Sequence, residues 1–387
     1  MKRSPMKDQI AIVGIGSTGF SRGDRSPLSL ALEASTRAIR DAGLTAADID
    51  GVVATSEAGA ASAPLLVASL GLTEVSHHSR PAPLIMFSLL DAAQAVFAGA
   101  ADHVLIVTPV MMSSWNSRRA AADPWRRGAR STIRPIPEDA ANANAYATWA
   151  GRYMHEFGAS KDPFARIAVN SRSNAAANEL AAMRKPLSFD EYHTGRMIRT
   201  PLNMFDMDYP ADGADAFVVT TVQRAAELPQ PPVLIHAATT GVVGENTEDQ
   251  LPSLKRHGQH VVVDHLKARS DLWIDDIDVF YPYDGFTIIA LSWLENCGFC
   301  EMGGAERYLA EHWNEERQRI EIDGRIPVNT HGGSLSEGAT RGTGHLREAV
   351  TQLRGQAGAR QVEGAKVALV TPGGFFFNSQ GAILRSA

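Results

Sequence analysis

Short apolar runs rich in branched residues alternate along the chain with amphipathic helical segments. The first run, QIAIVG at 9–14, has the continuous apolar character of a buried strand. Ser26 and Pro27 then supply a helix N-cap and a first-turn proline, and Gly43 ends the helix. Further runs have the same strand character: DGVVATS, HVLIVTP, ADAFVVTT, PPVLIHAATT, DVFYPY and KVALVTPGG. Strands separated by helices predict an α/β protein, with parallel sheets covered by helices on their faces.

Two motifs recur in the same order in the two parts of the chain. AADIDGVV near the start is followed by AGAADHVLIVTP. IDDIDVFYP, at 274–282, is followed by VEGAKVALVTPGG, which ends at Gly374. The shared order is stronger evidence of a repeat than either similarity alone. We therefore predict two similar α/β halves, at 8–225 and 230–387, arranged as a three-layer or five-layer stack.

The stretch from about 111 to 200 departs from this pattern because it contains no strand-like run. It predicts a helical insertion in the first half, of the kind that covers an active site. Between 116 and 134 its basic residues face only Asp123 as an acid; they are Arg118, Arg119, Arg126, Arg127, Arg130 and Arg134. Clustered guanidinium groups suit the binding of phosphates, but a solvated face or a subunit contact explains the same cluster.

Composition places the chain of 387 residues among globular proteins larger than one average domain. With 44% hydrophobic and 21% charged residues, disorder is excluded as the main state. A net charge of −6 argues against a general nucleic-acid binder. No apolar run approaches the ~20 residues of a membrane span, and the start of the chain is interpreted as a strand, not a signal peptide. We expect a cytoplasmic protein.

Two short motifs resemble ligand sites but lack the surrounding sequence that such sites need. GIGSTG, at 14–19, follows a strand as a dinucleotide fingerprint does, but helix signals appear only at Ser26 and no ribose-binding acid follows at the expected distance. We interpret it as a glycine-rich turn at the strand end. Cys297 and Cys300 form a CxxC without a second ligand pair, which predicts buried structural thiols and no metal site in this chain.

Three polar loops follow strands of the second half. PYDGFT places Tyr283 and Asp284 just past an apolar strand, where ligand sites of α/β sheets gather. NTHGGSLSEGATRGTG, at 329–344, leads into a helix beginning near His345, and TPGGFFFNSQ follows the last predicted strand. Glycine pairs let backbone N–H groups approach a ligand and stabilise an oxyanion. The candidate substrate and oxyanion residues are Asn329, Gly332, Gly333, Thr371, Gly373 and Gly374.

The order of these segments resembles the thiolase superfamily, most closely the branch of the sterol carrier protein x thiolase domain and the lipid-transfer-protein-like enzymes. The resemblance covers almost the whole chain. It rests on IAIVGIGSTGFS with the later DIDG, on PLNMFDMDYPADGADAFVV, and on VNTHGGSLSEG with QLRG. It implies two βαβαβαββ halves in an α/β/α/β/α stack, and a homodimer that pairs through a strand of the first half.

The positions that match the catalytic residues of thiolases are all changed. The nucleophilic cysteine of that family is matched near Ala82, and no cysteine occurs before Cys297, so the acyl-enzyme route is closed. Tyr283 matches a catalytic Asn or His, Ala339 matches the histidine of a GHP segment, and Thr371 matches the second cysteine. Ordinary thiolysis or Claisen condensation is therefore not expected.

A cysteine-less subgroup, the steroid side-chain aldolases, is similar to this chain in its YDxF tyrosine and its NTHGG loop. The resemblance implies retro-aldol cleavage of a bulky β-hydroxyacyl-CoA, with Tyr283 as a catalytic residue. These enzymes keep a second tyrosine where this chain has Ala339, so His331 and His345 are candidates to assist. The resemblance also implies a small partner with an OB-fold and a zinc ribbon, no cofactor in this chain, and zinc only in that partner.

Two other interpretations remain open from the sequence. One is a degenerate acyltransferase with a different nucleophile, and the other is a non-catalytic subunit that binds acyl-CoA or acts as a scaffold. A Tyr283 hydroxyl that opens to a cleft beside Gly332 and Gly333 favours the lyase, and one buried in packing favours the scaffold.

Overall fold

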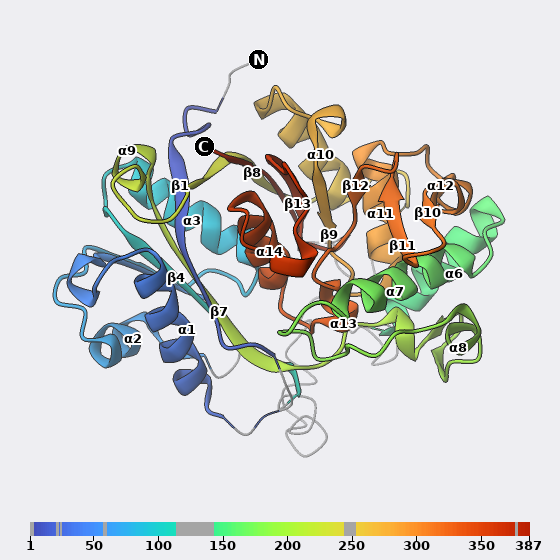
Figure 1. Cartoon of the computed structure of the whole chain (residues 1–387), viewed down its shortest axis with the longest axis horizontal. Helices are drawn as coiled ribbons and strands as arrows, with labels where there is room; N and C mark the ends of the chain where they lie inside the picture. The colour runs from blue at the N-terminus through green and yellow to red at the C-terminus, as the bar shows by residue number, and fades with distance from the viewer. Residues whose placement is uncertain are drawn as a thin grey trace.

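One mixed sheet of nine strands runs through both parts of the chain (Figure 1). The computed structural model describes residues 4–20, 23, 25–56, 60–113, 143–243, 253–375 and 378–387. The six arginines of the predicted phosphate cluster, at 118–134, lie outside the described residues. Among those described, no helix combines the length and the apolar character that crossing a membrane requires.

The strand order of the sheet is nearly symmetric about its centre, running β3-β2-β4-β7-β1-β8-β14-β13-β9. The strands are β1 Ile10–Ser17, β2 Gly51–Ala54, β3 His77–Ser79, β4 Val104–Met111, β7 Asp212–Thr221, β8 Val233–Gly241, β9 Val279–Pro282, β13 Val367–Thr371 and β14 Ser379–Ser386. In the first half, β1 pairs with β7 and β7 with β4 in antiparallel orientation, and β4 pairs with β2 in parallel orientation. In the second half, β8 pairs with β14 and β14 with β13 in antiparallel orientation, and β13 pairs with β9 in parallel orientation. Two similar halves produce this order; the division between 225 and 230 stays a prediction.

Two pairs of helices take matching positions in the two halves: α1 packs on β1 as α10 does on β8, and α3 packs on β4 as α14 does on β13. In the first half they are α1 Pro27–Asp41, η1 Ala46–Asp48, α2 Ala63–Leu70, α3 Ile85–Phe97 and α9 Val222–Ala225. In the second half they are α10 Gly258–Arg269, η4 Ile274–Asp276, α11 Thr287–Cys297, α12 Ala305–Glu311, α13 Gly333–Ser336, α14 Thr343–Leu353 and η5 Gly358–Arg360. The short strands β10 Trp313–Asn314, β11 Arg319–Ile322 and β12 Ile326–Pro327 form a separate three-stranded sheet.

Alternate side chains of the strands divide the core into layers. Along β1, Ala11 and Val13 join an outer cluster with α1 and α2, whereas Ile10 and Ile12 join a central cluster. That central cluster contains α3 and α14 together with strands from both halves, so these two helices lie between the two parts of the sheet (Figure 1). On the far side, α10 and α11 form a third cluster with the strands of the second half. The five layers agree with the α/β/α/β/α stack implied by the resemblance.

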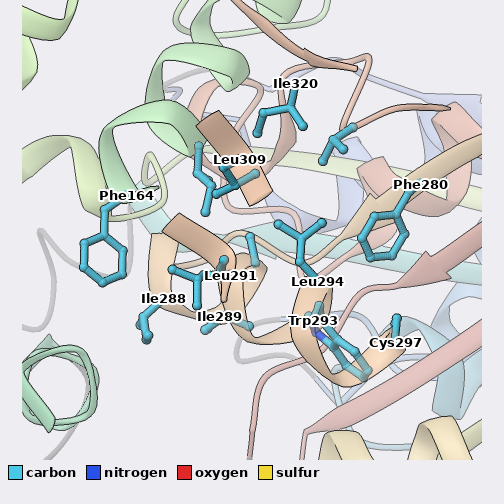
Figure 2. Close-up of a cluster of buried hydrophobic side chains, with 14 of the residues drawn as sticks. Phe164, Phe280, Ile288, Ile289, Leu291, Trp293, Leu294, Cys297, Leu309 and Ile320 are labelled. Atoms are coloured by element: carbon cyan, nitrogen blue, oxygen red, sulfur yellow. The ribbon is translucent and has the colours of Figure 1, made fainter. Parts of the chain in front are cut away.

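The outer cluster of the second half is the largest, and α11 supplies much of it. Figure 2 shows Trp293 and Leu294 of α11 near Phe280 of β9, with all three side chains buried. The indole N–H of Trp293 donates to the carbonyl of Gly373 at 2.6 Å. The core therefore holds the loop after β13 directly.

The glycines of GIGSTG serve close packing. Gly14 and Gly16 lie inside β1, so the prediction of a strand-end turn was wrong for both of them. A Cβ atom at Gly14 would lie 2.3 Å from the carbonyl oxygen of Ala38, and one at Gly16 would lie 2.2 Å from that of Ala34. The glycines therefore let α1 approach the sheet, and only Gly19 of this motif has a positive φ.

The repeated DID motif has the same structural role in both halves. Asp50 accepts hydrogen bonds at 2.8–2.9 Å from the N–H groups of 102–103, directly ahead of β4. Asp278 accepts them at 2.7 and 2.9 Å from the N–H groups of 366–367, where β13 begins. In each half the carboxylate thus joins the beginnings of two neighbouring parallel strands.

The described part of the predicted insertion is mostly helical and packs on the second half. It contains α6 Ala143–Phe157, α7 Asp162–Ala175 and α8 Phe189–His193, and it ends in β5 Met197–Arg199, a strand where the sequence pattern predicted none. β5 forms a hairpin with β6 Leu202–Asn203, and η3 Met204–Asp206 follows. Buried residues of α6 and α7 belong to the same cluster as α11. α7 also contacts α13 and β11. Sequence from the first half is thereby placed over the loops of the second.

Candidate active site

Three loops of the second half meet where β9 and β13 end. The N–H of Tyr283 donates to the carbonyl of Thr371 at 3.0 Å. The N–H of Asn329 donates to Phe280 at 3.0 Å, and its side-chain amide donates to Pro282 at 2.9 Å. Three residues predicted from the sequence, Tyr283, Asn329 and Thr371, are therefore held at the ends of these two neighbouring strands.

Asp284 lies fully buried at the centre of these loops. Its carboxylate accepts hydrogen bonds from the Ser334 N–H at 2.6 Å and the Ser171 hydroxyl at 3.1 Å, and His345 Nε2 lies 3.1 Å away. Gly333 has φ +59°, and a Cβ atom there would lie 1.9 Å from Asp284 Oδ2. Glycine is required at 333 because the carboxylate sits against the backbone.

The two predicted histidines contact each other and are fully buried. The ring centroids of His331 and His345 are 4.8 Å apart, in an edge-to-face arrangement. Removal from water, reinforced by His345, lowers the pKa of His331 well below its ordinary value, so its imidazole is neutral at pH 7. Among the described residues, neither nitrogen of His331 nor Nδ1 of His345 has a hydrogen-bond partner. The site thus keeps a neutral imidazole at His331 and unused hydrogen-bonding capacity on both rings.

A buried ionic network ties this site to the first half. Arg347 of α14 donates to both oxygens of Asp215 on β7, at 2.5 and 2.6 Å, and also to Glu337. Burial lowers the pKa of the guanidinium, but the two carboxylates outweigh it and raise that pKa above its usual value. Thr343 donates to Asp215 at 2.6 Å. The network holds α14, and with it His345, in a fixed position on the sheet.

Tyr283 is held as a neutral phenol beside these groups. Its ring is partly exposed and lies 5.7 Å from the ring of His345. Burial, followed by the negative charge of Asp208, raises the pKa of the Tyr283 hydroxyl above its ordinary value. A Cβ atom at Gly285 would lie 2.8 Å from that hydroxyl, so the ring folds back over Gly285.

Asp208 belongs to the site and was not identified from the sequence. Its N–H donates to the carbonyl of Gly285 at 3.0 Å, next to the Tyr283 ring. Removal from water raises the pKa of Asp208 to about 7; Arg341 opposes this rise and Asp284 adds to it. The segment MFDMDYPADGA carries the resemblance, but its several acids gave no signal of which one faces the site.

An apolar cavity of about 180 Å³ lies beside Asp208. Its lining includes Met183, Leu187, Met204, Phe205, Met207 and Leu335. Tyr283 does not line it, but Asp208 and Ser336 do. A larger cavity of about 790 Å³ lies between the N-terminal segment, α3, β8 and α10, and none of the predicted site residues lines it.

The predicted oxyanion glycines differ in whether their N–H groups are available. Gly332 donates to the carbonyl of Asn329 at 2.8 Å, and Gly373 donates to that of Thr371 at 2.9 Å. Within the described residues, no acceptor is found for the N–H of Gly333 or Gly374. The oxyanion role of this set stays a prediction.

The cysteines lie apart from these loops. Cys297 is buried at the end of α11, Cys300 is half-buried, and both are free thiols. Burial raises the pKa of Cys297 above its ordinary value and that of Cys300 to about 12, so neither supplies a thiolate at pH 7. The part of the chain that the structure describes holds no group of three His, Cys, Asp or Glu side chains placed to bind a metal ion.

Comparison with known proteins agrees with this architecture. Residues 251–386 match the family model "Thiolase C-terminal domain-like". The chain is 34% identical over 370 residues to a steroid side-chain-cleaving aldolase of Thermomonospora curvata, covering 89% of this chain and 90% of the relative. It is also 34% identical over 391 residues to a 17-hydroxy-3-oxo-4-pregnene-20-carboxyl-CoA lyase of Mycobacterium tuberculosis, covering 95% and 97%.

A solved structure described as "Ltp2-ChsH2(DUF35) aldolase" superposes with a TM-score of 0.85 at 32% identity, over 98% of both chains. These similarities show that the chain belongs to the thiolase superfamily, within the family of the steroid side-chain-cleaving aldolases. The resemblance stated from the sequence motifs, and the fold that it implied, are confirmed.

Proposed function

We propose that this protein cleaves the Cα–Cβ bond of a β-hydroxyacyl-CoA by a retro-aldol reaction. The products are a ketone and a shorter acyl-CoA. The names of both relatives support this proposal, because one cleaves steroid side chains and the other is a lyase of a steroid carboxyl-CoA. We expect a bulky, steroid-like acyl group.

The observation that carries the proposal is the neutral phenol of Tyr283 beside the carboxylate of Asp208, in a site that contains no cysteine. Retro-aldol cleavage needs a group that takes the hydroxyl proton, a group that returns a proton to Cα, and hydrogen-bond donors for the thioester enolate. Tyr283 suits the second role because its raised pKa keeps the hydroxyl protonated at neutral pH. The N–H groups of Gly333 and Gly374 are the candidate enolate donors. Acyl transfer through a thiolate has no support, because both thiols lie in or against the core.

One role for both histidines follows from their contacts. His345 is held by Asp284, so its ring orientation is fixed at 3.1 Å from the carboxylate. His331 remains neutral and packs edge-to-face on His345. Both supply hydrogen bonds to the thioester region in this proposal, and neither forms a covalent intermediate.

Assembly with a partner belongs to the same proposal. The name of the solved structure joins two components, Ltp2 and ChsH2(DUF35). We expect a second subunit here too, with an OB-fold and a zinc ribbon, and a homodimer of this chain. β3 is the edge strand of the sheet in the first half and is the candidate for dimer contact. Light scattering at micromolar concentration should report a dimer, and a monomer would count against this part.

Turnover with a panel of β-hydroxyacyl-CoA thioesters, with and without a candidate partner, tests the function. Tyr283→Phe should fold normally and lower cleavage by about 10²–10⁴-fold, because only the hydroxyl is removed. The matched control is Tyr308→Phe, since Tyr308 stacks on His312 outside the site. Full activity of Tyr283→Phe together with a lower melting temperature would instead mark Tyr283 as a structural tether.

A further inference from the structure

Asp208 and Asp284 both act on Tyr283, and together with Asp206, two residues before Asp208, they differ in how many of their oxygens are already occupied. Asp206 accepts hydrogen bonds from the Tyr192 hydroxyl at 2.6 Å, from the Thr287 hydroxyl at 2.8 Å and from the Asn203 N–H at 2.7 Å. Asp284 is held in the same way by the contacts described above. Both carboxylates are therefore committed to structure.

The Asp208 carboxylate is free by comparison. Among the described residues, none donates a hydrogen bond to it, and only Arg341 stands as an attractive charge. The side chain is partly exposed and lines the apolar cavity. Its lone pairs are thus available to a ligand.

The backbone nevertheless fixes where this carboxylate lies. The N–H of Asp208 donates to Gly285 at 3.0 Å, and the next N–H, of Tyr209, donates to the carbonyl of Ser334 at 3.1 Å. Gly285 is the residue over which the Tyr283 ring folds. One short segment therefore places a free carboxylate next to a catalytic phenol and at one end of a cavity.

We propose that Asp208 is the general base that accepts the β-hydroxyl proton of the substrate. This inference rests on the proposed function. The carboxylate takes the O–H proton, the Cβ–O bond becomes a carbonyl, and the electron pair of the Cα–Cβ bond passes into the thioester enolate. Tyr283 then gives its proton to Cα, and the proton held on Asp208 passes to the resulting phenolate. Asp208 and Tyr283 are thereby restored to their starting protonation states, and no co-reactant is needed.

The charges that face Asp208 suit this role. Arg341 favours the carboxylate, whereas Asp284 and removal from water disfavour it. Arg172 of α7 and Tyr209 line the same cavity. The balance leaves the pKa of Asp208 at about 7, where a base both exists as carboxylate and holds a proton well. Tyr283 cannot replace it, because the same carboxylate helps to keep the phenol protonated.

The pH profile of kcat and kcat/KM for wild type and Asp208→Asn tests the inference. Wild-type activity should rise with pH through about 7, as the carboxylate loses its proton. Asp208→Asn should lower kcat by about 10²–10⁴-fold, abolish that rising limb and leave KM nearly unchanged. Compared with Asp208→Asn, the variant Asp208→Glu should recover part of kcat and the rising limb of the pH profile.

Glu295→Gln is the matched control, because burial raises the pKa of Glu295 to about 7 as well, and this residue pairs with Tyr153 away from the site. It should keep the limb. An active Asp208→Asn with an unchanged limb would overturn the base assignment and leave the retro-aldol function standing. Wild type that cleaves no thioester of the panel would overturn the proposed function and the inference with it. If Asp208→Asn does not fold, the test is made with Asp208→Glu. An unchanged kcat and an unchanged midpoint of the rising limb of the pH profile in that variant would contradict the assignment of Asp208 as the base.

Discussion

His345 Nε2 lies 3.1 Å from Asp284 Oδ1, and both side chains are fully buried. A carboxylate accepts hydrogen bonds, so Nε2 carries the proton and donates it to Asp284. Nδ1 has no hydrogen-bond partner among the described residues. A contact between the loop after β9 and the first turn of α14 thus fixes which nitrogen of His345 the site presents to a ligand.

The close approach of Asp284 to the backbone predicts a severe effect of Gly333→Ala. The new Cβ atom would lie 1.9 Å from the carboxylate, on a residue whose φ is +59°. We expect the free energy of unfolding to fall by about 3 kcal/mol or more, from overlap and backbone strain together, with loss of cleavage. Urea denaturation and turnover of the same preparation measure both.

Gly355→Ala is the control, because φ is +71° there and a Cβ atom meets nothing within 4 Å. It carries the backbone strain alone, about 1–2 kcal/mol, and should leave turnover intact. Equal losses in the two variants would show that overlap with Asp284 is unimportant.

The network between the halves predicts a large effect of Asp215→Ala on stability. Arg347 would keep Glu337 but lose its bidentate partner inside the protein. We expect the free energy of unfolding to fall by about 3–5 kcal/mol, because the buried guanidinium loses one of the two carboxylates that compensate its charge. Glu301→Ala breaks an exposed ion pair with Arg307 and should cost less than about 1 kcal/mol. A small loss in Asp215→Ala would contradict the assigned role.

Glu295 predicts a specific pH dependence of stability. Burial raises its pKa from 4.5 to about 7 in the folded protein, so folding favours the protonated form. The stability that this carboxyl contributes is complete below pH 4.5 and is lost as pH rises through about 7. Between those limits Glu295→Gln should gain roughly 2–3 kcal/mol relative to wild type. Parallel stability curves for the two proteins from pH 4 to 8 would rule this out.

Much of the fold was accessible from the sequence because its signals are local. The Ser26 cap forms as expected, because its side-chain hydroxyl accepts a hydrogen bond from the Ser29 N–H, and Gly43 ends the segment with φ +74°. The repeated DID motif indicated two similar halves, because the last aspartate of the motif, Asp50 or Asp278, accepts hydrogen bonds from the start of the neighbouring strand in each half. β14 escaped notice, since SQGAILRS mixes polar and apolar residues and is buried only by pairing between β8 and β13.

The site was accessible only in part. Tyr283, Asn329 and Thr371 could be grouped because each follows a strand end or lies in a glycine-rich loop. Asp208 could not, because its importance depends on the absence of partners that the neighbouring Asp206 has. The 113-residue separation between Ser171 and Asp284 hides another contact, since a helix of the insertion reaches the site through the fold alone. The predicted arginine cluster at 118–134 lies outside the described residues, and its phosphate role stays a prediction.

In the proposed reaction this site breaks a carbon–carbon bond by proton transfer without an acyl-enzyme. Mass spectrometry of products and protein, after reaction with a β-hydroxyacyl-CoA in D₂O, tests it most directly. We expect ketone and shorter acyl-CoA in equal amounts, one deuterium at Cα of the acyl-CoA, and protein of unchanged mass. Free coenzyme A or an acylated protein would contradict it.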